Sequence, residues 1–214
     1  MSWLGDVFGK KSGEVEAVRS LTHPSQLNTG DIINMSFLNQ QDLSGQRLEV
    51  TEVNSYDFDN RAEPSFTLKN DSGDVFFLSI KNDNGKECLS VSKLLKRKKV
   101  LELFDEEAFA GIFNAGAGIE LNRRDNIPSS LEEWTASQYV EEQDCANGYY
   151  YEGDFRNRLL PQYEKDSCGL QYYLLEDANC DFAIEIEVYS DGETEVSAAV
   201  YLSMTSIEEM WPGA

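Results

Sequence analysis

The sequence predicts an α+β protein in which antiparallel strands predominate, arranged as two β-meander modules joined by a helical connecting segment. Three observations favour this class. Short apolar or alternating segments, separated by turn residues, fill both ends of the chain. The stretch between them contains helix-capping signals. Two hairpins about 106 residues apart match in their residue pattern, as repeated modules would.

The composition is that of a folded protein despite a formal net charge of −21. Of its 214 residues 41% are hydrophobic, which is enough to build a core. No apolar stretch approaches the roughly 20 residues of a membrane-spanning helix. The first residues carry their charges after the apolar side chains and lack a long apolar core, so they do not resemble a signal peptide. We therefore expect a cytoplasmic protein.

Residues 1–26 predict an amphipathic segment followed by a short helix that ends before Pro24. One face of the segment gathers four apolar side chains at helical spacing, namely Trp3, Leu4, Val7 and Phe8. Contact with a membrane surface or a partner's groove is one interpretation. Docking on the body of the same protein is favoured, because so short a helix is marginal by itself.

Residues 27–100 predict the first meander module. Its apolar segments and the turns between them predict strands over 32–37, 48–53, 65–68, 75–80 and 86–92. Asn84-Gly85 suits a two-residue type I′ turn, whose central residues both have positive φ.

Residues 101–147 predict the helical connector, and residues 148–214 predict the second, acidic meander module. A short helix over 105–113 has Asp105 as its N-cap and acids in its first turn. Overlapping capping boxes at Ser129 and Ser130 predict a second helix over 129–143. The two meander modules either share one core or fold separately.

The proposed repeat can be tested by strand register, because a one-residue slip moves every side chain to the other face. A two-residue loop in the first hairpin pairs apolar Ile80 with Leu89. In the second hairpin only a three-residue loop, 190–192, pairs apolar residues, with Ile186 opposite Val196. Chance similarity of two amphipathic hairpins remains the alternative to an internal repeat.

The acidic charge lies almost entirely in the second half of the chain. Residues 1–100 carry 14 acidic and 13 basic side chains, whereas residues 101–214 carry 25 acidic and 5 basic ones. A strongly acidic surface repels nucleic-acid phosphates, so direct nucleic-acid binding is not expected. It favours a protein partner, particularly a basic one.

The sequence offers little for catalysis. His23 is the single histidine, it precedes a proline, and no nucleophile motif surrounds it. The four cysteines have no CxxC spacing, which is weak support for zinc. We assign no catalytic residue, no metal ligand and no cofactor from the sequence.

Two groups of residues are candidates for binding. In the predicted register Glu187 faces Glu195, with Glu185 and Glu193 close by on the same face, an arrangement that suits a cation or a basic partner. A solvated face with splayed side chains is the favoured alternative. The second group combines aromatic and basic residues typical of interfaces, Tyr149, Tyr151, Arg156 and Arg158, although a strand with one face in the core explains the tyrosines as well.

The C-terminal run Tyr172-Tyr173-Leu174, the stretches 183–189 and 192–196, and Ile207 to Pro212 resemble uncharacterised bacterial β-rich domains of unknown function. The Gly30-Asp31-Ile32 opening of the first meander resembles them too. Some of these domains are encoded near phage-shock-type membrane-stress genes. The resemblance implies a cytoplasmic bacterial accessory protein and no particular chemistry.

The leading hypothesis is a non-enzymatic binding or adaptor protein that meets a protein partner through its acidic, aromatic-containing C-terminal half. One alternative is an enzyme that uses carboxylates with a divalent cation. Another is a mimic of nucleic-acid charge, which requires acids spaced like phosphates on one surface.

Overall fold

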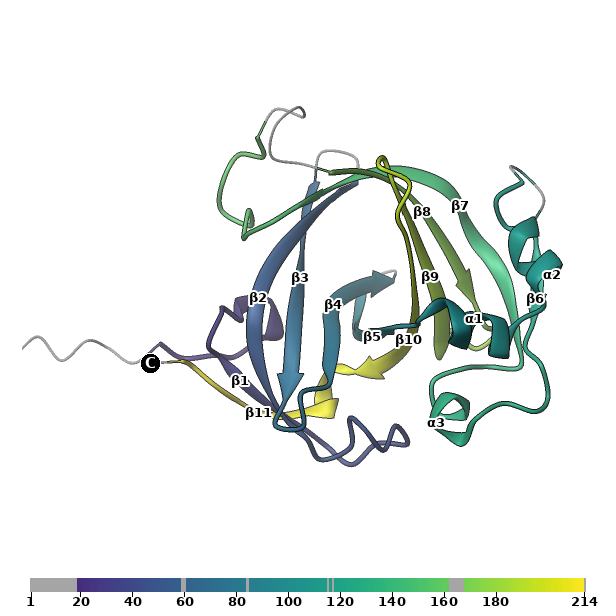
Figure 1. Cartoon of the computed structure of the whole chain (residues 1–214). Coiled ribbons are helices and arrows are strands. Elements are labelled where there is room, and N and C mark those ends of the chain that lie inside the picture. Colours follow the sequence, from purple (N-terminus) through teal and green to yellow (C-terminus); the bar gives the residue numbers. More distant parts are fainter. Residues whose placement is uncertain are drawn as a thin grey trace, which may run out of the picture.

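A computed structural model describes residues 19–58, 61–83, 85–114, 116, 118–161 and 168–213 (Figure 1). The amphipathic segment with Trp3, Leu4, Val7 and Phe8 and the start of the helix after it lie outside the described residues. In chain order the elements are η1 (Pro24–Gln26), β1 (Ile32–Met35), β2 (Arg47–Phe58), β3 (Arg61–Asn70), β4 (Val75–Asp83), β5 (Lys86–Leu94), α1 (Arg97–Leu103), α2 (Glu106–Gly111), β6 (Glu120–Asn122), α3 (Ser129–Glu132), β7 (Gln138–Tyr151), β8 (Cys168–Glu176), β9 (Phe182–Tyr189), β10 (Thr194–Ser203), η2 (Met204–Ser206) and β11 (Ile207–Trp211).

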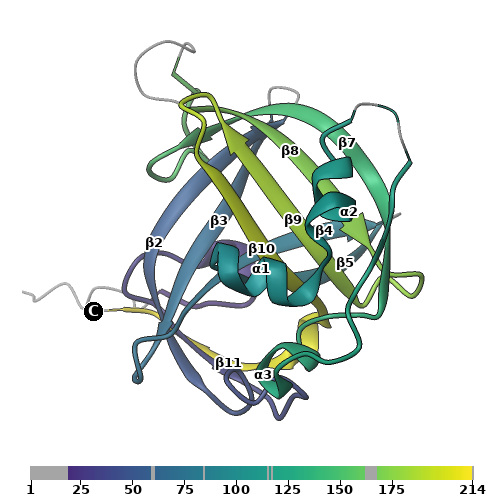
Figure 2. The same ribbon diagram turned by 45° about the vertical axis from the view of Figure 1, so that its right-hand side comes forward.

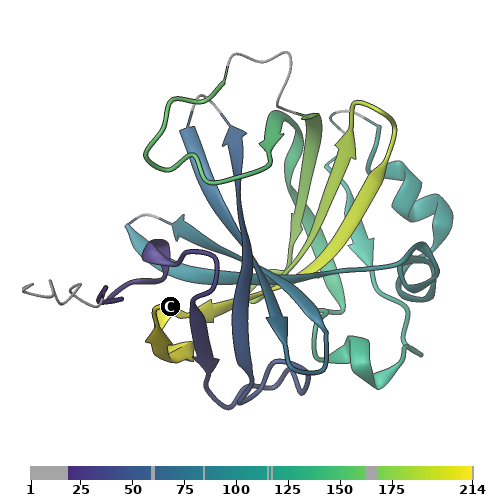
Figure 3. The ribbon, with the colours of Figure 1, turned by 60° about the vertical axis from the view of Figure 1, so that its left-hand side comes forward.

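The strands form one antiparallel sheet, in the order β11-β1-β2-β3-β4-β5-β10-β9-β8-β7-β6. An additional pairing joins β2 to β7, with Ser55 opposite Tyr151 and Asp57 opposite Tyr149. This pairing closes eight strands, β2 to β5 and β7 to β10, into a ring (Figures 1 and 3). The prediction of a mainly antiparallel β protein is therefore confirmed, and the strands of both predicted modules belong to one sheet.

Strand β2 is long enough to pair with three other strands. Its first residues pair with β1, its last residues pair with β7, and β3 runs along its other edge. Strand β1 also pairs with β11, and Figures 1 and 3 show these two strands side by side at the end of the sheet away from the helices. Strands β1 and β11 thus form a short ladder outside the ring.

The hairpin registers predicted from the sequence are confirmed. In β4–β5 Ile80 faces Leu89, and in β9–β10 Ile186 faces Val196. The loop 190–192 is closed by a hydrogen bond from the Tyr189 amide to the Glu193 carbonyl, 2.9 Å long. Asp105 caps α2 as predicted, because its carboxylate accepts hydrogen bonds from the amides of Glu107 and Ala108.

The helix predicted over 129–143 is wrong beyond residue 132. Helix α3 ends at Glu132, and β7 begins at Gln138, within the stretch predicted as a helical connector. Strand pairing outweighs the capping signals, because Val140 has partners in both β6 and β8. Tyr139 is fully buried and packs edge-on against Phe104, 6.1 Å between ring centroids.

The main apolar core lies on one face of the sheet, under the helices. Figures 1 and 2 both show α1 crossing the outside of β9 and β10. Its Val100 and Leu103 join a core that includes Ile184 and Ile186 of β9. Since successive side chains of a strand point to opposite faces, the alternate residues of the same strands face the interior of the ring. No helix among the described residues is long and apolar enough to cross a membrane.

Candidate functional site

The interior of the ring holds a cavity of about 600 Å³. Its lining comes from all eight strands of the ring, with Tyr56, Phe58, Glu63, Pro64, Ser65, Phe77, Leu78, Ser79, Ser92, Leu94, Gln143, Ala146, Asn147, Tyr172, Leu174, Glu185, Glu187, Glu195 and Ser197. This size is within the range of about 300–1,000 Å³ that small-molecule sites occupy. A smaller hollow of about 330 Å³ adjoins it, and both are lined by Glu63, Pro64 and Ser79.

The two hollows meet where β3 and β4 stop pairing. These strands are joined only from Phe66 to Lys69 of β3, although β3 begins five residues earlier, at Arg61. Pro64 lies in the unpaired stretch, and a proline has no backbone N–H to offer a neighbouring strand. The smaller hollow is also lined by exposed Asn82 and Glu87, so it extends from this unpaired stretch to the surface.

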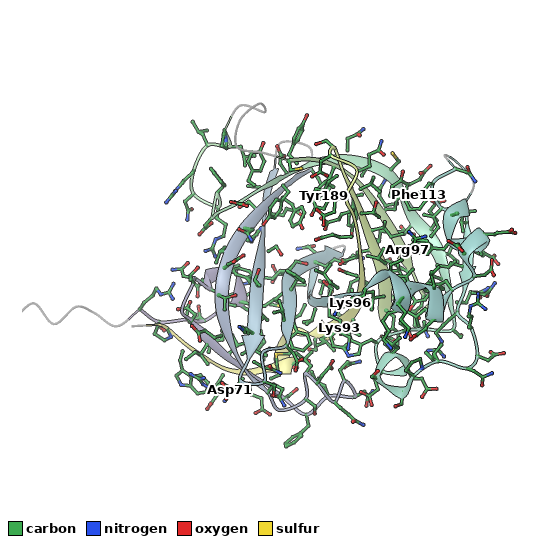
Figure 4. All side chains as sticks on the ribbon, in the orientation of Figure 1. Asp71, Lys93, Lys96, Arg97, Phe113 and Tyr189 are labelled. Carbon is green, nitrogen blue, oxygen red and sulfur yellow. The ribbon has the colours of Figure 1, made fainter. Side chains whose placement is uncertain are left out.

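The acidic candidates divide between the cavity and the surface. Glu187 faces Glu195 directly, as the sequence predicts, and both line the cavity together with Glu185. Glu193 is exposed at the β9–β10 turn and does not line the cavity. Tyr189 and Asp71 mark opposite ends of the ring in Figure 4, and Tyr189 is at the end where the acids gather. The acidic face therefore points inward.

Phenol hydroxyls hold the carboxylates in place. Tyr56 donates to Glu187 Oε2 over 3.1 Å, and Tyr189 donates to the same oxygen. Tyr172 donates to Glu185 Oε1 over 3.4 Å. Tyr189 and Tyr172 come from β9 and its neighbour β8, whereas Tyr56 comes from β2 and reaches Glu187 across the ring.

The lining of the larger cavity contains four glutamates and, among its described residues, no lysine, arginine or histidine. The cation beside it, Lys81, lines the smaller hollow and already forms an ion pair with Glu176. The Lys81 ammonium also donates to the hydroxyl of Tyr201, which in turn donates to Glu176 over 2.6 Å. Glu187 and Glu185 thus accept hydrogen bonds from neutral phenols, and the charge of Lys81 reaches Glu185 from the adjoining hollow.

Burial changes how these acids ionise. Desolvation and the nearby charge of Glu187 raise the pKa of Glu185 to about 7, although hydrogen bonds from Tyr172 and Ser92 and the charge of Lys81 oppose the shift. Desolvation also raises the pKa of Glu187, although the hydroxyls of Tyr189 and Tyr56 oppose the shift. The pKa of Glu195 is raised by burial and by the charge of Glu193. The cavity therefore gains and loses protons near neutral pH.

An aromatic wall stands beside the carboxylates. The rings of Phe58 and Tyr172 are 5.4 Å apart and tilted by 55°, and Tyr56 stacks on Phe58 at 6.1 Å. Gly148 of β7 makes room for this wall, because a Cβ there would lie 2.4 Å from the Phe58 ring. The cavity thus combines carboxylates with flat apolar surfaces, as small-molecule sites do.

The second group of candidates lies elsewhere. Tyr149 and Tyr151 are on the part of β7 that closes the ring against β2, and Tyr151 is fully buried. Arg156 pairs with Asp154 and donates to Asn28 Oδ1 over 2.9 Å, which ties the segment after β7 to the segment after η1. Arg158 is exposed. These contacts give the first three residues a structural role at the closure of the ring.

Sequence reasoning missed the residues that complete the cavity from the first half of the chain. Tyr56 and Phe58 alternate on one face of β2, which is a local signal that they share an environment. Nothing local indicates that this face meets β9 across the ring. The contact between Tyr56 and Glu187 spans 131 positions.

Within the described ranges, no three or more histidine, cysteine, aspartate or glutamate side chains are grouped so that they could hold a metal ion. Glu185, Glu187 and Glu195, the carboxylates considered for a divalent cation, are among these residues.

Comparison with known proteins gives no further guide. No family model matches the chain, and no curated protein or solved structure is significantly similar to it.

Proposed function

We propose that this protein is a non-enzymatic binding protein and that the cavity inside the ring is its binding site for a small molecule. The observation that carries the proposal is a hollow of about 600 Å³ whose wall presents carboxylates and aromatic rings. Such a combination of concave shape, apolar surface and few polar groups is the usual form of a ligand site.

The energetics of the acids support this role. Burying an ionised carboxylate without a cation costs stability, and an apolar side chain would avoid that cost. Glu185 and Glu187 lie in the middle of β9, between apolar residues that the fold requires. Buried acids that lower stability, at positions where the fold does not require an acid, are typical of functional sites.

The proposal departs from the partner that the sequence favours. A protein partner would have to meet the acids on an outer surface, and three of the four nominated acids line the cavity. Of the four nominated aromatic and basic residues, three lie at the ring closure. We therefore assign the binding role to the cavity. The cytoplasmic location expected from the sequence remains a prediction.

The two predicted meander modules are part of the proposal as well. Strands β2 to β5 and strands β7 to β10 follow one another in mirrored order around the ring, with β5 beside β10 and β2 beside β7. The helices α1, α2 and α3 lie between the two sets in the chain. This arrangement supports an origin from two related four-stranded units.

A ligand-observed NMR screen of the full chain against a mixed library of fragment-sized cations, neutral molecules and anions tests the proposal. We expect binders that are lost when Ser197→Phe fills the cavity from β10 or Ala146→Phe fills it from β7. Thr194→Phe is the matched control, because Thr194 is exposed on the same strand and does not line the cavity. An absence of binders, or binders that both filled variants retain, would overturn the proposal.

A further inference from the structure

We propose that the ligand of the cavity is an organic ammonium ion with a compact aromatic or apolar body, whose charged head is bound by Glu187 and Glu185. This inference rests on the proposed function and names the chemical class of the ligand. The carboxylates provide the charge, the phenols orient them, and the aromatic wall accommodates the body.

The first argument is charge. The described lining of the larger cavity has four carboxylates and no basic side chain. Lys81 in the adjoining hollow offsets only part of the cost of burying Glu185, because the pKa values of Glu185 and Glu187 are still raised. A cation that enters the site removes the remaining penalty. An anion would add to the repulsion. The cavity is therefore selective for positive charge.

The second argument is geometry. Both phenols that contact Glu187 donate to its Oε2, which leaves the lone pairs of Oε1 for an N–H donor from a ligand. Tyr172 contacts Glu185 through Oε1. The phenols cannot neutralise the acids, but they fix them in position before a ligand arrives. Such fixed acceptors favour an ammonium ion, which has several N–H donors.

The third argument is the aromatic wall beside the acids. Tyr56, Phe58 and Tyr172 form a chain of rings with centroid separations of 6.1 Å and 5.4 Å. Cations are attracted to the faces of aromatic rings, and the same rings cover an apolar body. A hydrated metal ion gains nothing from such a wall. The three features together point to an organic cation.

Proton release follows from this assignment. A bound ammonium ion stabilises the ionised form of Glu185, whose pKa is otherwise about 7. Below that pH, Glu185 is protonated in most of the protein molecules, and these molecules must release the proton when they bind the cation. The affinity for an amine should therefore rise as the pH is raised from 6 to 8, by up to about tenfold per pH unit below the pKa.

Isothermal titration calorimetry on the full chain tests the inference with three probes that share one body. These are 2-phenylethylamine, 2-phenylethanol and 3-phenylpropionate, and n-hexylamine provides a second amine with a flexible body. We expect the amines to bind at least about tenfold more tightly than the alcohol, since a charged group replaces a neutral hydrogen bond. The anion should not bind. Titrations at pH 6.5 in two buffers with different ionisation heats should show net proton release with the amines.

The variants Glu187→Gln and Glu185→Gln should each weaken amine binding by about tenfold or more, and Glu185→Gln should also remove the proton release. Glu193→Gln is the matched control, because this acid is exposed on the same hairpin, and it should bind like the parent protein. Circular dichroism of each variant shows whether the fold is intact.

The outcomes separate the two proposals. Binding of the alcohol or the anion as tightly as the amine, with loss of binding in Ser197→Phe, would refute the ammonium ligand and leave a cavity that binds small molecules. Equal amine affinity in Glu187→Gln and the parent protein would also refute it. Failure of all four probes, in a protein whose cavity binds neutral or anionic fragments, would refute it as well.

Discussion

The hairpins β4–β5 and β9–β10 lie side by side in the ring, joined through β5 and β10, and both carry buried apolar side chains on their outer faces. Leu78 of β4 and Ile184 of β9 are matched positions, and each is 1% exposed or less. Their cross-strand neighbours, Val91 and Ala198, are buried as well. Apolar side chains of different shape thus build the same sheet.

The inner faces of the two hairpins differ in charge. Ser79 and Lys81 of β4 match Glu185 and Glu187 of β9. Lys81 has an acidic partner in Glu176, whereas Glu185 and Glu187 receive hydrogen bonds from phenols. The outer positions therefore specify the fold, and the inner positions are free to carry the chemistry of the cavity.

Truncation of a buried side chain on each hairpin tests whether the outer faces contribute equally to stability, and it should have the greatest effect of the changes considered. Leu78→Ala and Ile184→Ala should each lower the free energy of unfolding by about 2–5 kcal/mol, because each leaves a space in a closely packed core. Urea unfolding followed by circular dichroism measures both. A small loss for one variant and a large loss for the other would break the equivalence. Thr194→Ala, at an exposed position, should change the value little.

The pH dependence of stability tests whether the inner face of β9 carries a perturbed acid. Glu185 has a pKa of about 7 in the folded protein, above the reference value of 4.5. The folded state therefore binds more protons than the unfolded state between pH 4.5 and 7, and stability falls as the pH rises through this window. Glu185→Gln removes the ionising group. Above pH 7 it should be more stable than the parent protein by on the order of 2–3 kcal/mol.

Urea unfolding at pH 5 and at pH 8 measures this effect. The parent protein and Glu185→Gln should have similar stability at pH 5 and separate at pH 8. Glu193→Gln is the control and should follow the parent protein at both values, because Glu193 is exposed. If the free energies of unfolding of Glu185→Gln and the parent protein change with pH in parallel, burial does not perturb the pKa of this acid.

Local signals in the sequence were sufficient to predict the hairpins and one helix start. The registers of both hairpins follow from pairing apolar residues across the loop, as Ile186 with Val196 shows. Asp105 caps α2 because its side chain reaches two amides within the next three residues. Interactions between near neighbours leave a pattern that can be read without the rest of the chain.

Contacts between distant segments were not predictable in this way. The capping boxes at Ser129 and Ser130 start a helix, but the strand pairings of Val140 end the helical region early. Alternation places Glu185 and Glu187 on one face without saying whether that face points in or out. An apolar face is buried equally well inside a ring or under helices, and the alternation of residues along one strand does not distinguish the two.

Substitution of one glycine in each hairpin turn compares the two turns, and it should lower stability the least. Gly85 and Gly192 have φ angles of +85° and +93°, which other residues rarely adopt, and neither has an atom within 4 Å of where a Cβ would lie. Gly85→Ala and Gly192→Ala should therefore each cost about 1–2 kcal/mol, through backbone strain alone. Urea unfolding measures both, and Gly169→Ala on β8 is a control in ordinary strand conformation, with only a van der Waals contact to the Tyr149 ring. The two turns differ by one residue in loop length, yet strain from a positive φ does not depend on loop length. A loss of stability in only one of the two variants would mean that the two glycines do not share a strained positive φ.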